Sequence, residues 1–133
     1  MSTDEDPFAA VAPPAPALRI TPRETPIPSL IIRLEGEVTQ DERAVLEQAL
    51  EEAVAAGPAL LVVDLTPLVF CSSACLNALL RARLAAEEAG VWLVLAGPGP
   101  QLRQLLDITG TDRVFTVRPS LQAVIGPHHN RTG

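Results

Sequence analysis

The stretch VVDLTPLVFCSSACLNALLRAR, residues 62–83, decides the fold of this chain. Its beginning completes a continuous apolar run, 59–65, that is typical of a strand buried on both faces of a sheet. After a turn at Pro67, leucines at helical spacing predict a helix over about 74–89. The inward face of that helix is expected to carry Leu76, Leu79, Leu80 and Leu84. A buried strand that leads into an amphipathic helix is the repeating unit of an α/β domain.

The same alternation continues on both sides of this stretch. Strands are expected at 17–21, 29–38, 59–65, 91–96 and 114–117, and helices between 39 and 57 and at 74–89, 101–108 and 119–125. Pro22 is expected to close the first strand, and Thr39 with Glu42 forms a capping box for the first helix. The order β-β-α-β-α-β-α-β-α predicts one layered α/β domain over 17–126, with parallel pairing by right-handed crossovers. The flanking segments, 1–16 and 127–133, are expected to be disordered tails.

Composition excludes several classes of protein. With 133 residues the chain has the length of one domain, and 47% hydrophobic but only 3% aromatic residues predict an aliphatic core. A formal charge of −6 argues against a nucleic-acid surface. Seven acidic residues within 35–52 predict either a solvated helix face or a surface that attracts a basic partner. No signal peptide or run of about 20 apolar residues is visible, so a cytoplasmic protein without a membrane segment is expected.

The cysteines and histidines give no sign of catalysis or metal binding. Cys71 and Cys75 are four residues apart, without the C-x-x-C spacing of a dithiol motif, and His128 and His129 lie in the C-terminal tail. No nucleotide-binding or nucleophile motif is present, so neither an enzyme nor a cofactor is expected. The cysteines are interpreted as small buried hydrophobes without a disulfide. A redox-responsive pair remains as a further alternative.

Ser72 and Ser73 stand where the chain leaves the strand region and begins a helix. One of them is expected to cap the helix by accepting a backbone N–H, which is worth about 1 kcal/mol. A helix N-terminus also tolerates a phosphate, because its N–H groups are free and its partial charge is positive. Phosphorylation there would add about −1.5 to −2 charges at an exposed position without unfolding the domain.

The segment DLTPLVFCSSACLNALL, residues 64–80, resembles the signature of the STAS domain of bacterial anti-sigma factor antagonists. EGEV at 35–38, VWLVLAG at 91–97 and LLDITGTDRVFTV at 105–117 extend the resemblance over roughly 17–126. The resemblance implies a single-domain STAS-like fold, with a mixed β-sheet flanked by about four helices. It also implies a serine at the start of the second helix that an anti-sigma factor with kinase activity phosphorylates.

Aligned on this pattern, Ser73 takes the place of the phosphorylated serine, with Ser72 as the alternative. The family pattern is Asp-Ser-Ser/Thr-Gly, so Ser72 replaces the aspartate, Ala74 the second hydroxyl residue and Cys75 the glycine. The implied partner surface combines the loop 66–73, the start of the second helix and the acidic turn around Glu35–Thr39, before the first helix. Its expected residues are Glu37, Thr39, Thr66, Phe70, Ser72, Ser73, Ala74, Asn77 and Arg81.

The resemblance therefore implies an anti-sigma factor antagonist that binds an anti-sigma factor and serine kinase, releases a sigma factor, and is switched by phosphate on Ser73. The departures at 72, 74 and 75 motivate an alternative, a constitutive binding module of a signalling complex or a transporter. A monomer or weak dimer fits either function.

Overall fold

The structure is a computed structural model that describes residues 18–24 and 29–124. Its elements are β2 (Leu18–Glu24), β3 (Ser29–Val38), η1 (Gln40–Glu42), α2 (Arg43–Ala55), β4 (Leu60–Asp64), β5 (Leu68–Cys71), α3 (Ser73–Ala89), β6 (Trp92–Ala96), α4 (Pro100–Thr109), η2 (Thr111–Arg113) and β7 (Thr116–Arg118). Residues 121–124 are also helical. The expected tails, 1–16 and 127–133, lie outside the described residues, as do both histidines.

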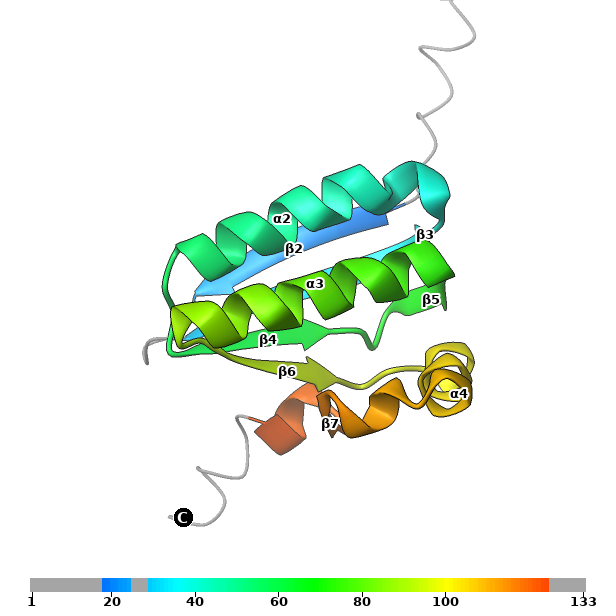
Figure 1. Ribbon diagram of the computed structural model, residues 1–133. Coiled ribbons are helices and arrows are strands. Elements are labelled where there is room, and N and C mark those ends of the chain that lie inside the picture. The colour runs from blue at the N-terminus through cyan, green and yellow to red at the C-terminus, as the bar shows by residue number, and fades with distance from the viewer. Residues whose placement is uncertain (1–17, 25–28, 125–133) are drawn as a thin grey trace, which may run out of the picture.

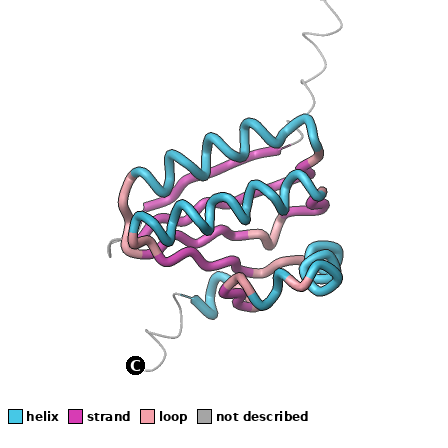
Figure 2. The backbone as a smooth tube through the Cα atoms, viewed as in Figure 1, coloured by secondary structure: helices cyan, strands magenta, loops and turns pink. Residues whose placement is uncertain are grey.

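The six strands form one mixed sheet. The order along it is β2-β3-β4-β6-β7, and β5 pairs with β3 off this path. β2 runs antiparallel to β3, whereas all the other pairs are parallel. Figure 1 shows α2 and α3 lying side by side across one face of the sheet, and Figure 2 shows the strands as a layer behind them. The expected α/β fold with a mixed sheet and about four helices is confirmed.

An aliphatic core fills the space between the two long helices and the sheet. Its largest fully buried side chains are Leu34, Val38, Leu46, Leu50, Leu61, Val63, Leu65, Leu79 and Leu95. A smaller cluster around Ile31, Val62 and Ala96 covers the other face, against Leu121 and Val124. Because each buried aliphatic side chain contributes roughly 1.5–3 kcal/mol, this core is the main source of stability.

β5 is one strand more than the sequence predicted. Leu68–Cys71 was expected to belong to the loop 66–73. In the structure it is a strand in which only Leu68 and Cys71 are buried. A four-residue strand with this pattern has no period-2 alternation from which it could be recognised. It forms because β3 extends beyond its pairing with β4. The first half of β3 pairs with β4, and the end of β3 pairs with β5.

Three further details differ from expectation. β2 continues through Pro22 to Glu24, because within 18–24 and 29–124 it is an edge strand, where a missing N–H is tolerated. The last strand is 116–118 in place of 114–117. Leu84 is 56% exposed, since the buried side of α3 consists mostly of small residues. The buried residues of this helix are Ala74, Cys75, Ala78, Ala82 and Ala86, and the two leucines Leu76 and Leu79.

Within 18–24 and 29–124, no helix combines the length and the apolar character that crossing a membrane requires.

Candidate functional site

The two segments of the expected partner surface lie side by side at the end of β3. In the register between β3 and β5, Glu37 is opposite Phe70 and Val38 is opposite Cys71. The Gly36 amide donates to the Pro67 carbonyl at 3.3 Å, which fixes the start of the pairing. The acidic turn before the first helix and the loop 66–73 therefore form one continuous surface.

A register shift in this ladder places two apolar side chains at the surface. The shift lies between Gly36 and Glu37, so that Val69 has no register partner. Val69 is 69% exposed and Phe70 is 40% exposed. The sequence pointed to Phe70 but missed Val69, since in an apolar run of four residues nothing distinguishes the outward from the inward positions.

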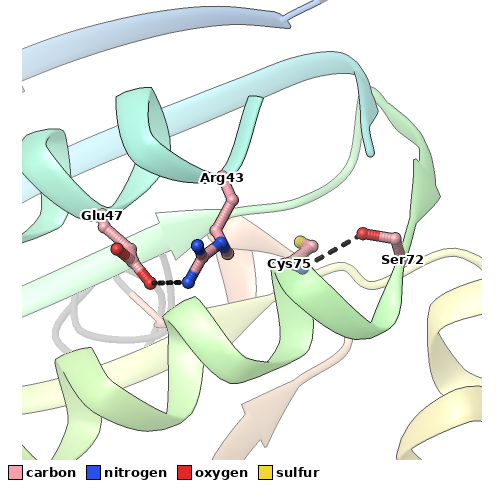
Figure 3. Close-up of polar contacts among 4 residues, drawn as sticks. All are labelled: Arg43, Glu47, Ser72 and Cys75. Atoms are coloured by element: carbon pink, nitrogen blue, oxygen red, sulfur yellow. Dashed lines mark hydrogen bonds and ion pairs between the residues drawn. The ribbon is translucent and has the colours of Figure 1, made fainter. Parts of the chain in front are cut away.

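Ser72 is the helix cap. Its backbone is extended, and its hydroxyl oxygen accepts a hydrogen bond from the Cys75 amide at 3.2 Å (Figure 3). Its carbonyl accepts from the Leu76 amide at 3.0 Å, and its own amide donates to the Val38 carbonyl at 3.0 Å. The half-buried Ser72 is thus fully engaged in joining β3 to α3.

Ser73 is the first residue of α3 and is exposed. Within the described part of the chain, its hydroxyl makes no hydrogen bond to another residue. The geometry therefore separates the two serines: Ser72 holds the helix start, and Ser73 presents a free hydroxyl beside the first N–H groups of the helix. A phosphate at such a position is electrostatically favourable.

Asn77 and Arg81 continue the surface along α3. They follow Ser73 at intervals of four residues and are exposed, so the three side chains share one side of the helix. Arg81 lines a shallow hollow between α2 and α3 together with Glu47 and Glu51. In contrast, Ala74 is only 8% exposed and faces the core, so it offers a partner little side-chain surface.

Thr66 and Thr39 lie on the two turns of this surface. Thr66 is exposed, and its amide donates to the carboxylate of the buried Asp64 at 3.1 Å, which shapes the turn after β4. Thr39 donates from its amide and its hydroxyl to Glu42, which confirms the expected pairing of the two residues. These two bonds hold the pKa of Glu42 below its ordinary value of 4.5, and the bond from the Thr39 hydroxyl has the larger effect.

Arg43 and Glu47 form an ion pair of 3.5 Å on α2, beside the first turns of α3 (Figure 3). Both side chains are partly exposed, and an ion pair of this kind contributes at most about 0.5 kcal/mol. It adds a positive and a negative charge at the rim of the surface.

The two cysteines correct the sequence interpretation. Both are fully buried, as expected, but they are joined by a disulfide and their Cα atoms are 5.4 Å apart. The expectation of two unbonded thiols is therefore wrong for this structure. Spacing alone could not show this, because it is the N-cap geometry at Ser72 that brings the residue before the cap close to the third residue of the helix.

Gln101 is a second residue that the sequence gave no reason to select. Its side chain, at the start of α4, contacts the main chain of Cys71 across thirty residues of sequence. Its oxygen accepts from the Cys71 amide at 2.8 Å, and its nitrogen donates to the Cys71 carbonyl at 2.9 Å. A side chain that completes a strand edge leaves no periodic signal in the sequence.

Across the residues whose placement is described, three or more His, Cys, Asp or Glu side chains nowhere gather into a possible metal site.

Comparison with known proteins gives a family and a set of structural relatives. The family model described as "Mlab, STAS domain" matches residues 24–121. No curated protein sequence matches the chain. Among solved structures, an anti-sigma factor antagonist from Mycobacterium paratuberculosis is 26% identical, with a TM-score of 0.73 over 81% of this chain and 92% of that chain.

Two structures of the anti-sigma factor antagonist SpoIIAA share the fold at 16% identity. The unphosphorylated form aligns with a TM-score of 0.70 over 84% of this chain and 97% of that chain. The phosphorylated form, from Bacillus, aligns with a TM-score of 0.65 over 82% and 98%. Since the family model covers well over half of the sequence, the chain belongs to the STAS domain family.

Proposed function

We propose that the protein is an anti-sigma factor antagonist: it binds an anti-sigma factor that is also a serine kinase, and phosphorylation of Ser73 ends the interaction. The observation that carries the proposal is that the two serines have different structural roles. Ser72 caps α3, while Ser73 is exposed with a free hydroxyl at the first position of the same helix. The 26% identical Mycobacterium protein, described as an anti-sigma factor antagonist, supports the class of function.

The surroundings of Ser73 suit a reversible charge switch. Phosphate would meet the free N–H groups at the start of α3, so the domain stays folded. The same phosphate would place about −1.5 to −2 charges next to Val69 and Phe70, on a surface that already carries Glu37. A partner that buries these apolar side chains would then have to desolvate a dianion, and its affinity falls.

The surface has the composition of a protein interface. Val69 and Phe70 contribute exposed apolar side chains, and the other expected contact residues, apart from Ala74, are polar. The proposed contact residues are Glu37, Thr39, Thr66, Phe70, Ser72, Ser73, Ala74, Asn77 and Arg81, to which the structure adds Val69. The proposal is a binding protein that works in the cytoplasm without a cofactor, as a monomer or weak dimer.

Intact mass measurement with site mapping, on protein purified from its native host, tests the proposal. We expect one added phosphate, located on Ser73 and missing in Ser73→Ala. Ser72→Ala is the matched control, because it removes the neighbouring hydroxyl and should still accept phosphate at Ser73. Phosphate on Ser72 alone would contradict the assignment.

A constitutive binding module is the second candidate, and the family-pattern departures at Ser72, Ala74 and Cys75 favour it. In this case the protein carries no phosphate under any growth condition. Partner binding then survives in Ser73→Ala and is lost in Ser73→Asp, since the surface is used without being regulated. Phosphate that appears on Ser73 and disappears when the partner kinase is deleted would support regulation by phosphorylation and reject the constitutive module.

A further inference from the structure

The disulfide between Cys71 and Cys75 encloses the proposed acceptor. The covalent ring runs from the last residue of β5, through Ser72, Ser73 and Ala74, to the first turn of α3. The bond therefore spans the three residues whose conformation decides how Ser73 is presented. Neither the proposed function nor the family pattern, which has a glycine at position 75, uses the two thiols.

The strand side of this ring is firmly anchored. The Cys71 amide and carbonyl are both bound by Gln101, at 2.8 and 2.9 Å, and the next amide, that of Ser72, is bound by Val38 of β3. Cys75, on the other side, lies in the first turn of the helix, where its amide, among the residues that the structure describes, is bound by the Ser72 hydroxyl alone, at 3.2 Å. A bond between the two sulfurs thus ties the first turn of α3 to a fixed point of the sheet.

We propose that Cys71 and Cys75 are a redox switch: the disulfide closes the first turn of α3, and the dithiol lets it open. Helix ends open locally at low free-energy cost. An opened first turn lets Ser73 reach farther from the domain, and so deeper into the active site of a kinase, than a closed turn does. If the proposed function holds, oxidation therefore withholds Ser73 from the kinase, and reduction releases it.

Hydrogen peroxide is the oxidant of the proposed reaction, because it is small and takes up the two electrons that disulfide formation releases. One thiol, as thiolate, attacks hydrogen peroxide and becomes a sulfenic acid, with one water released. The second thiolate attacks that sulfur, the S–S bond forms and a second water leaves, so two thiols and one hydrogen peroxide give one disulfide and two waters. Both residues are fully buried, so a small oxidant or an opening of the turn is required. Cys71 Sγ lies 3.6 Å from the Ser72 carbonyl oxygen, an acceptor that a thiol at this position can use.

Hydrogen exchange on the full chain tests the switch without any partner. The protein is oxidised with hydrogen peroxide or reduced with dithiothreitol, and the loss of two hydrogen atoms is verified by intact mass. We expect the amides of Cys75 and Leu76 to exchange about 30-fold more slowly in the oxidised form, the factor that closing a five-residue loop gives. Amides of Leu61 and Val63 in β4 report global unfolding and serve as the internal reference: in the reduced form the amides of the first turn should exchange faster than these, which assigns the effect to local opening.

The double variant Cys71→Ala/Cys75→Ala should show the faster exchange under both conditions. Equal exchange of the Cys75 and Leu76 amides in the two forms of the natural protein would overturn the proposal. So would failure of the folded protein to form the intramolecular disulfide with peroxide. A redox effect on these amides, found in a protein that never carries phosphate, would keep the switch and reject the phosphorylation.

Discussion

Gln101 binds both main-chain groups of Cys71, as a neighbouring strand would. Its side-chain oxygen accepts from the Cys71 amide at 2.8 Å, and its side-chain nitrogen donates to the Cys71 carbonyl at 2.9 Å. β5 is paired with β3 on one side, and this amide group closes its other side where the chain enters α3. In Figure 1, α4, which carries Gln101 near its start, lies next to β5. The position of the two serines therefore depends on α4 as well as on the sheet.

Gln101→Ala is expected to lower the free energy of unfolding by about 1–3 kcal/mol, because it leaves two partly buried main-chain groups without a partner. Urea denaturation measures the loss. Gln104→Ala is the matched control on the exposed side of the same helix and should change stability by less than about 0.5 kcal/mol. Equal effects of the two substitutions would mean that water replaces the Gln101 contacts.

Ser72→Ala is expected to destabilise the fold by about 1 kcal/mol, since it removes the cap from the Cys75 amide. Ser73→Ala removes a hydroxyl one residue later that is exposed and unbonded, so it should cost less than about 0.5 kcal/mol. The same denaturation experiment compares them. A larger loss for Ser73→Ala would reverse the assignment of the two serines.

Ser73→Asp is expected to leave the domain folded and to stabilise it by about 0.3–1 kcal/mol at low salt, because a negative charge at the first helical position complements the helix dipole. The gain should shrink as salt is added. Thermal unfolding at two ionic strengths measures both effects. Destabilisation at low salt would show that this helix start does not accept a negative group.

Thr39→Val is expected to raise the pKa of Glu42, because the hydroxyl bond is the largest cause of its lowered value. Thr39→Ser keeps the hydroxyl and should keep the low pKa. An NMR titration of the Glu42 carboxyl carbon distinguishes the variants, and an unchanged titration in Thr39→Val would refute the cause.

The same lowered pKa sets a direction for stability. A carboxyl whose folded pKa lies below its unfolded value of 4.5 stabilises the native state above that pH. This contribution is lost as the pH falls through the folded pKa of Glu42. The stability difference between the natural protein and Thr39→Val should therefore narrow as the solution is acidified below pH 4.5.

Gly97→Ala is expected to be more damaging than Gly90→Ala. Both glycines have a positive φ, 66° and 75°, so either substitution costs about 1–2 kcal/mol in backbone strain. A methyl group at Gly90 meets open space, whereas one at Gly97 collides with the Thr66 hydroxyl and adds about 1–3 kcal/mol. Thr66→Ala should relieve the added cost when it is combined with Gly97→Ala. No relief would mean that the backbone, and not Thr66, limits position 97.

The sequence was sufficient for the fold where burial on both faces leaves a continuous apolar run. β4 and β6 are of this kind, and each was predicted to within one residue at its ends. The capping pair Thr39 and Glu42 was also predicted, because its spacing is local. The leucine spacing of α3 was only partly reliable. Leu76 and Leu79 are buried as expected, but alanines and Cys75 make up the rest of the buried stripe, and Leu84 is 56% exposed.

The proximity of the two segments of the proposed surface could be predicted, but the contacts that produce it could not. The acidic turn and the serine loop were expected to be neighbours, and the register of Glu37 with Phe70 places them so. The strand that produces this register, the exposure of Val69 and the contact from Gln101 all depend on chain segments that meet only after folding. The disulfide belongs with them, since it is the cap at Ser72 that sets the distance between its two ends.

Pro22, in the middle of β2, has a consequence for self-association. Among the residues that the structure describes, β2 is an edge strand, and at Pro22 it has no N–H to offer to a further strand. An unprotected edge invites a second chain to extend the sheet, which is a common beginning of aggregation. Here the ladder with β3 is kept, while the outer side of the sheet is a poor template for growth. Copies of the protein that meet in solution are thereby steered away from β-sheet polymerisation along this edge.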